Sequence, residues 1–213
     1  MSTRDLPHPV LARMFARMSE RMEDAGAREY RKEMLSGLAG RVIEVGAGNG
    51  LNFRHLPDAV TEVVALEPEP YLRELARKAA DEASVPVVVT DGVADDLPGQ
   101  DGTFDAGVAS LVLCSVPDQA SALRELFRVI RPGGELRFFE HVAARSPGLA
   151  RLQRIVDRLF WPRVGGGCHT HRDTAAAIEG AGFTIEEMRR FPFRVCILTA
   201  PVTPHIVGRA RRP

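Results

Sequence analysis

Short apolar runs alternate along this chain with amphipathic segments whose apolar residues recur at three- and four-residue steps. The apolar runs predict buried strands, and the amphipathic segments predict helices that cover them. Predicted strands lie at 42–45, 63–66, 85–90, 104–109, 135–141 and 183–191, and predicted helices at 9–36, 70–83, 121–130, 149–161 and 173–181. Nearly continuous apolar strands separated by helices are typical of an α/β fold whose parallel sheet is covered on both faces.

The first predicted helix, at 9–36, has an apolar face made of Val10, Leu11, Met14, Phe15, Met18 and Met22. This pattern favours a helix that packs against the core. The alternative is a lid whose Met and Phe side chains line a substrate pocket. We expect residues 1–36 to form a helical N-terminal cap on a catalytic core of residues 37–213, within a single domain that spans 1–213.

The last strand has two candidate positions. Residues 195–199 and residues 205–210 are both apolar enough to pair with the sheet, and only one of them needs to do so. The preceding run, 183–191, carries charges at alternate positions, which predicts an exposed edge of the sheet.

Composition predicts a globular protein of ordinary domain size, with 213 residues, of which 45% are hydrophobic and 26% charged. The 28 basic and 28 acidic residues balance. We therefore expect no nucleic-acid partner, and we expect Arg209, Arg211 and Arg212 to form a short solvated tail. No apolar run approaches the length of a membrane span, although peripheral membrane contact stays open. Charges such as Arg4 and Asp5 interrupt any signal-peptide core, which favours a cytoplasmic protein. Nothing here predicts an oligomeric state.

The cysteines Cys114, Cys168 and Cys196 lie far apart in the sequence, with no C-x-x-C motif. This pattern predicts free thiols in a reducing compartment and no bound metal. The segment from Cys168 to His171 superficially suggests a metal site, but its spacing matches no familiar zinc motif. We expect a loop that enters a helix, with Thr170 as the N-cap.

The segment Arg41-Val-Ile-Glu-Val-Gly-Ala-Gly-Asn-Gly-Leu51 predicts a buried strand that ends in a glycine turn. Glycines let the backbone approach a ligand closely. An acid, Glu44, lies two residues before the first glycine, and another, Glu67, ends the next strand. Dinucleotide-binding loops have the spacing G-x-G-x-x-G, whereas here Leu51 occupies the third glycine position. The spacing therefore disfavours a dinucleotide and an NAD-type oxidoreductase.

The pattern Glu44-x-Gly46-x-Gly48-x-Gly50 resembles the first motif of class I S-adenosylmethionine (SAM)-dependent methyltransferases, with further resemblance at 101–105 and at 129–134. The resemblance implies a Rossmann-like, doubly wound, seven-stranded and mostly parallel sheet with an antiparallel last strand. It also implies that SAM is bound by a methionine-side loop, by a ribose-binding acid, by an adenine-contacting segment and by residues that close over the cofactor. In that order these are Glu44, Gly46, Ala47, Gly48, Asn49, Gly50 and Asn52; Glu67 and Pro68; Val93, Ala94 and Asp95; and Ser110 and Leu111.

The adenine segment departs from the pattern of the family. Val93 occupies the position where many members have an aspartate. Adenine would then contact the backbone of Ala94 and the side chain of Val93. Asp95 has two interpretations: it supplies the missing acceptor, or it caps a helix.

A narrower resemblance links the chain to proteins like the thiol S-methyltransferases. It rests on Leu113-Cys114-Ser115, Glu140-His141-Val142, Gly167-Cys168 with Thr170 and Arg172, and Pro204-His205-Ile206. The resemblance implies a small apolar acceptor, with a thiol as the leading class. It places the last strand at 205–211 and leaves 193–202 as a loop over the acceptor pocket. Some proteins of this branch are membrane-anchored and begin with a hydrophobic segment. This chain departs from them at the N-terminus, where it has an amphipathic helix.

Three residues are candidates for the catalytic site. His141, at the carboxyl end of a strand, is the candidate to orient the acceptor or take its proton; the alternative is a buried structural histidine. Cys114 is a candidate to line the acceptor pocket, or a small buried hydrophobe. His205 faces the acceptor or simply starts the last strand. The competing functions are an O- or N-methyltransferase of a natural product or phospholipid headgroup, and a SAM-binding protein without catalysis.

Overall fold

The computed structural model describes residues 9–195 and 197–213. The charged residues Arg4 and Asp5 and the thiol of Cys196 therefore lie outside the described residues. The strands of the sheet are β1 Gly40–Val45, β2 Val60–Leu66, β3 Val87–Thr90, β4 Phe104–Ser110, β5 Ile130–His141, β6 Thr184–Pro192 and β7 Pro204–Arg211. The helices and helical turns are α1 Pro9–Met22, η2 Glu23–Ala27, α2 Arg28–Leu35, η3 Phe53–His55, α3 Pro70–Asp81, α4 Gln119–Val129, α5 Pro147–Leu159, α6 Trp161–Val164, α7 Thr174–Gly180 and η4 Ile197–Val202.

The seven strands lie in the order β3-β2-β1-β4-β5-β7-β6. Strands β1 to β5 are parallel, and β7 runs antiparallel between β5 and β6. The predicted α/β class and the antiparallel last strand are thus confirmed. The direction in which the chain is wound changes between β1 and β4, and open α/β sheets bind ligands beyond the carboxyl ends of such a pair.

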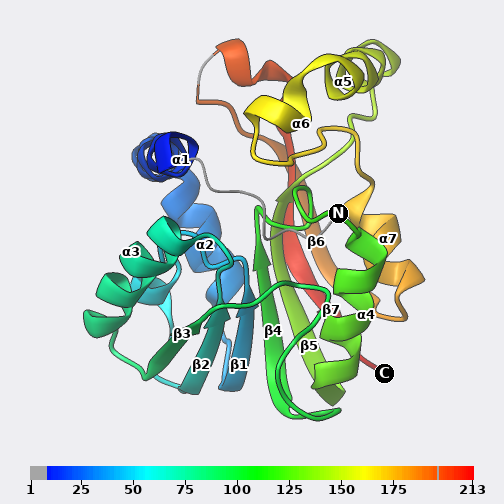
Figure 1. The fold of residues 1–213 in the computed structure, drawn as a ribbon. Coiled ribbons are helices and arrows are strands. Elements are labelled where there is room, and N and C mark those ends of the chain that lie inside the picture. The colour runs from blue at the N-terminus through cyan, green and yellow to red at the C-terminus, as the bar shows by residue number, and fades with distance from the viewer. Residues whose placement is uncertain (1–8, 196) are drawn as a thin grey trace.

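Helices cover both faces of the sheet (Figure 1), as the apolar strands predict. One buried cluster joins α4 and α7 to one face, and a second joins α2 and α3 to the other. Neighbouring residues of β1 point to opposite faces, so that Val42 belongs to the second cluster and Ile43 to the first. Burial of both faces is the reason why these strands are apolar along their length rather than alternating.

The N-terminal segment differs from its prediction. A backbone break at Gly26, with φ 110°, divides the predicted single helix. Small residues of α1, Ala12 and Ala16, pack near Leu72 of α3, whereas Val10 is 73% exposed and Met14 50% exposed. Met22 packs against the second cluster, as predicted. The prediction of a core-packing face is wrong for the rest of that face, whose side chains are all at least 36% exposed. The alternative of a lid stays a prediction.

The chain ends in the position that the family resemblance implies. Strand β7 is Pro204–Arg211, while Ile197–Val202 forms a 3-10 turn instead of a strand. Arg209 and Arg211 lie in β7 and form ion pairs with acids of β6, so the prediction of a solvated tail is wrong. The edge position predicted for 183–191 is confirmed, because β6 lies at the end of the sheet. In the described part of the chain, no helix has the length and apolar character to cross a membrane.

Candidate functional site

The glycine turn follows β1 at the point where the winding reverses. Gly46, Gly48 and Gly50 have φ values of 65°, 59° and 77°, a region that side chains disfavour. A Cβ on Gly46 would overlap Val112, and one on Gly50 would meet α3. A Cβ on Gly48 would have Phe15 of α1 as its nearest neighbour, at 3.9 Å. Gly48 is thus the glycine whose open side is free for a ligand.

Glu67, at the end of β2, lies directly beside this open glycine. Its side chain is buried, and its Oε2 accepts a hydrogen bond from Gly48 N at 2.8 Å. Its Oε1 accepts one from Glu69 N at 2.9 Å. Burial raises the pKa of the Glu67 carboxyl. Each carboxylate oxygen has a second lone pair, so the group can still accept hydrogen bonds from a ligand.

Glu44 belongs to a buried polar network beneath the glycine turn. Asn52 Nδ2 donates to Glu44 Oε1 at 2.7 Å. Arg31 Nη1 donates to Asn52 Oδ1 at 2.9 Å and to Ser110 Oγ at 2.8 Å, while Arg31 Nε pairs with Glu23 at 2.6 Å. The network connects α2, the glycine turn and the end of β4. It therefore holds three of the predicted cofactor residues in one arrangement.

Arg31 was not predicted from the sequence. It lies on the buried face of α2 with Ala27, Met34 and Leu35, at helical spacings of four, three and four residues from its neighbours on that face. A single arginine inside an apolar helical stripe is a signal for a buried, paired charge. That signal predicts burial, but it does not identify Asn52 and Ser110 as partners.

Glu44 makes the stability of the ligand-free protein depend on pH. Burial raises its pKa from 4.5 to about 7. Below pH 4.5 the carboxyl is protonated in both states and contributes nothing. As the pH rises towards 7, the unfolded carboxyl ionises first, so stability falls, and above pH 7 the penalty is constant. The free energy of unfolding of Glu44→Gln should therefore rise, relative to that of the unsubstituted protein, by about 3 kcal/mol when the pH is raised from 4.5 to 8.

Urea denaturation of both proteins at the two pH values measures this gain. Because the other buried acids are present in both proteins, the difference between them isolates Glu44. An equal stability difference at pH 4.5 and pH 8 would contradict the prediction.

The residue after β4 has an unusual backbone conformation. Leu111 has φ 56° and is the only non-glycine residue with positive φ in the described part of the chain. Its N–H donates to Phe139 O at 2.7 Å, which holds the conformation against β5. Such strain costs on the order of 1–3 kcal/mol and is concentrated at functional sites. It turns the chain sharply at the predicted cofactor residues Ser110 and Leu111.

Glu140, the penultimate residue of β5, fixes the segment that follows. Its Oε1 accepts hydrogen bonds from Val112 N and Leu113 N at 2.9 Å each, and its Oε2 accepts one from Cys114 N at 3.3 Å. Burial raises the pKa of this fully buried carboxyl. Sequence reasoning noted Glu140 but assigned it no role. An acid at the end of an otherwise apolar strand was the available signal.

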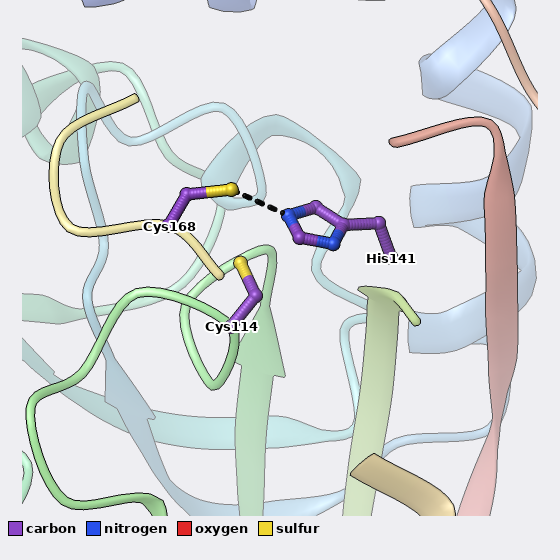
Figure 2. Close-up of side chains that lie close together, drawn as sticks. All are labelled: Cys114, His141 and Cys168. Carbon is purple, nitrogen blue, oxygen red and sulfur yellow. Dashed lines mark hydrogen bonds between the residues drawn. The ribbon is translucent and has the colours of Figure 1, made fainter. Parts of the chain in front are cut away.

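Cys114, His141 and Cys168 converge at the carboxyl end of the sheet (Figure 2). The Sγ atoms and one ring nitrogen all lie within 4.8 Å of one another. His141 Nε2 is 3.0 Å from Cys168 Sγ, and Trp161 Nε1 donates to the same sulfur at 3.1 Å. The proximity of the two thiols lowers the pKa of Cys168 and raises that of Cys114. Spacing along the chain did not indicate this group, because each of the two cysteines lies 27 residues from His141.

His205 lies beside this group but outside it. Its ring centroid is 6.1 Å from that of His141, and the rings of Phe139, Phe191 and Phe193 surround it at 5.5 to 5.9 Å. Burial lowers its pKa to about 4, so the ring is neutral at pH 7. Its Nδ1 donates to Thr203 O at 3.0 Å. His205 therefore contributes a neutral ring to an aromatic wall.

The loop from Gly165 to Arg172 is tied to the segment after β4. His169 N donates to Cys114 O at 2.8 Å, and Arg172 Nη1 donates to Leu113 O at 2.7 Å. Asp157 accepts hydrogen bonds from Thr170 N and Thr170 Oγ1. The prediction that Thr170 caps a helix is wrong, because Asp173 caps α7.

The predicted adenine segment forms a loop after β3. Val93 makes an isolated bridge with Asp96. Asp95 is exposed and precedes no helix, so its interpretation as an N-cap is wrong. Ala47 N donates to Leu66 O, which places the glycine turn beside the end of β2. Asn49 and Pro68 belong to the turns that follow β1 and β2, so both lie at the same end of the sheet.

Comparison with known proteins finds relatives along nearly the whole chain. Thiol S-methyltransferase TMT1B of Homo sapiens is 35% identical over 210 residues, covering 95% of this chain and 84% of that protein. The chain belongs to the family of these methyltransferases. Thiol S-methyltransferase TMT1A of Homo sapiens is 34% identical and covers 79% of this chain. Residues 43–138 of the new family member match the methyltransferase domain family itself.

Several solved structures of other proteins have the same fold as this methyltransferase. Geranyl diphosphate methyltransferase in complex with SAM aligns with a TM-score of 0.68 at 14% identity, covering 98% of this chain and 93% of that one. The [4+2]-cyclase SpnF aligns with a TM-score of 0.67 at 21% identity, covering 85% of this chain and 78% of that one. At these identities the likeness concerns the fold alone.

Membership of this family implies SAM as the methyl donor, and the residues at the ends of β1 and β2 fit that cofactor. Gly48 leaves an open side, where a side chain would have only Phe15 near it. Glu67 presents a buried carboxylate beside that opening, a group that can accept two hydrogen bonds from a ribose diol. Glu44 adds a second buried acid, which suits the cationic methionine end.

Proposed function

We propose that this methyltransferase transfers the methyl group of SAM to the sulfur of a small apolar thiol. The observation that carries the proposal is the 35% identity to a thiol S-methyltransferase over 95% of the chain. Relatives that act on other atoms match less well: a ubiquinone biosynthesis O-methyltransferase of Xanthomonas axonopodis is 28% identical and covers 75% of the chain.

The proposed cofactor site lies at the ends of β1, β2 and β4. The glycine turn with Glu44 would hold the methionine end, Glu67 the ribose, and the loop at Val93, Ala94 and Asp95 the adenine. Ser110 and Leu111 would close over the bound cofactor. When bound, SAM supplies a methyl group that is already activated by the sulfonium, so the protein mainly aligns donor and acceptor.

The proposed acceptor site lies beyond β4 and β5. The neutral ring of His205 and the phenyl rings of Phe139, Phe191 and Phe193 offer an apolar wall. His141 would orient the acceptor, and Cys114 would line the pocket. A thiol suits this site because its reference pKa, about 8.5, leaves some thiolate at pH 7, so that no strong base is needed.

A matched set of acceptors tests the proposal. An alkyl thiol, the alcohol and the amine of the same chain length would each be incubated with SAM, and S-adenosylhomocysteine would be measured. We expect turnover with the thiol and none above background with its analogues, and we expect the rate to rise with pH towards the pKa of the thiol. A Glu67→Ala variant serves as the control for background. Turnover with the alcohol or the amine but not the thiol would overturn the proposal.

A further inference from the structure

We propose that Cys114, His141 and Cys168 bind a zinc ion and leave its fourth coordination position open for the sulfur of the acceptor. The binding of the ion follows from the geometry alone. The occupation of the fourth position by a thiol rests on the proposed function.

The three side chains have the geometry of a zinc site. Tetrahedral zinc with bonds of about 2.3 Å to sulfur and about 2.0 Å to nitrogen separates its ligand atoms by about 3.5–3.8 Å. Here the ligand atoms lie within 4.8 Å of one another, and the closest pair, His141 Nε2 and Cys168 Sγ, is 3.0 Å apart. Figure 2 shows both sulfur atoms and the imidazole directed towards one point. Small shifts of the side chains therefore suffice to coordinate an ion.

The donor set selects zinc and a particular kind of site. Two thiols and an imidazole are ligands that zinc prefers, whereas calcium and magnesium prefer oxygen. Structural zinc sites usually have four protein ligands, while catalytic sites have three and an open position. In the described part of the chain, this group contains three such ligands. The nearby carboxylate of Glu140 is occupied by the backbone N–H groups of residues 112–114.

The surrounding hydrogen bonds support bound thiolates. Cys114 and Cys168 come from loops that are joined by the hydrogen bond from His169 N to Cys114 O. Trp161 Nε1 donates to Cys168 Sγ at 3.1 Å, which favours negative charge on that sulfur. All three ligand residues are at most 8% exposed. The site is thus held in place from separate elements and shielded from solvent, as a tuned metal centre requires.

The position of the group links it to methyl transfer. Cys114 lies three residues after Leu111, and Val112 between them contacts the position where Gly46 would carry a side chain. Glu140 fixes this short segment, and His141 is the residue after Glu140 in the chain. The proposed zinc therefore lies beside the proposed cofactor site rather than in a separate part of the fold.

The chemistry balances without an oxidant or reductant. The acceptor loses its proton to solvent, and its sulfur binds the open position of the ion with the electron pair of the broken S–H bond. That sulfur then forms a bond to the methyl carbon, while the bond between this carbon and the sulfonium breaks. The electron pair of the broken bond stays on the sulfur of S-adenosylhomocysteine. The neutral thioether product is a weaker ligand than a thiolate and leaves the ion.

Metal analysis and cobalt substitution test the site. We expect the purified, reduced chain to bind about one zinc per molecule after metal removal and reconstitution with zinc alone. Cobalt in its place is expected to show the charge-transfer absorption of thiolate ligands. Cys114→Ser, Cys168→Ser and His141→Gln should each weaken zinc binding about 100-fold or more. His171→Gln is the matched control, since this histidine lies in the same loop but outside the group, and it should bind zinc normally.

Titration with an alkyl thiol, without SAM, tests the open position. The thiol should change the cobalt spectrum, and the matching alcohol should not. Absence of zinc and of the thiolate bands in a protein that methylates thiols would overturn the metal site and leave the proposed function intact. Zinc binding in a protein that methylates only alcohols or amines would instead overturn the thiol acceptor and the role of the open position. A Cys114–Cys168 disulfide that persists under reducing conditions would also overturn the site. The spectrum of the unsubstituted protein decides the question even if a variant fails to fold.

Discussion

Glu67→Ala is expected to weaken SAM binding about 100-fold or more. A carboxylate that accepts two hydrogen bonds from the ribose contributes about 1.5–3 kcal/mol for each bond to a charged group. Alanine removes both acceptor oxygens. It also removes the hydrogen bond that Gly48 N donates to Glu67 Oε2 at 2.8 Å. Isothermal titration calorimetry with SAM measures the affinity. The loss should appear in binding as well as in turnover, because the proposed contact of the acid is with the cofactor rather than with the acceptor.

Glu69→Gln provides a matched control for this loss. Glu69 lies two residues away, and its carboxylate caps α3 by accepting from Leu72 N at 2.7 Å. Its replacement should lower stability by about 1 kcal/mol or less and leave SAM affinity unchanged. If Glu67→Ala bound SAM as tightly as the unsubstituted protein, or if both variants lost affinity equally, the proposed ribose contact would be wrong.

Glu140→Ala is expected to lower the free energy of unfolding by about 3–5 kcal/mol. The carboxylate accepts hydrogen bonds from three consecutive backbone N–H groups, and each buried donor left without a partner costs about 1–3 kcal/mol. Total stability is about 5–15 kcal/mol, so the loss would be a large fraction of it. Urea denaturation measures the change. Residues 112–114 would also lose their fixed position, so turnover should fall in the protein that remains folded.

Glu140→Gln separates shape from hydrogen bonding. Glutamine fills the same space and keeps one acceptor oxygen, so we expect a smaller loss of stability than with alanine. Because its amide nitrogen cannot accept, part of the three-donor arrangement is still lost. Equal stability of the alanine variant and the unsubstituted protein would show that the backbone donors find other partners, and the positioning role would then be wrong.

Local sequence pattern was sufficient for the glycine turn and the strands around it. The positive φ values of Gly46, Gly48 and Gly50 follow from a strand that ends in a tight turn, which needs residues without a side chain. The position of Glu67 at the end of β2 follows from the same rhythm of strands. Parallel strands end at one edge of a sheet, so both features had to lie close together.

Amphipathic pattern predicted the first helix but not its surroundings. The periodicity of α1 shows which side chains share a face, whereas the neighbouring helix decides which face is buried. Ala12 and Ala16 pack near Leu72, and Phe15 remains 46% exposed near Gly48. The sequence pattern also could not predict that Arg31 bonds to Ser110 or that Glu140 bonds to Leu113, since these partners lie in distant segments of the chain.

The sequence by itself determined the order of strands and helices, the methyltransferase motif and the acids beside it, because each depends on residues close together in the chain. Only the tertiary structure decided that Cys114, His141 and Cys168 form one group. Their separation along the chain carries no metal-binding pattern, and the ends of β4 and β5 meet the loop after α6 only when the sheet is assembled. Hydrophobic burial drives that assembly, and the convergence of the three ligands is a consequence of it.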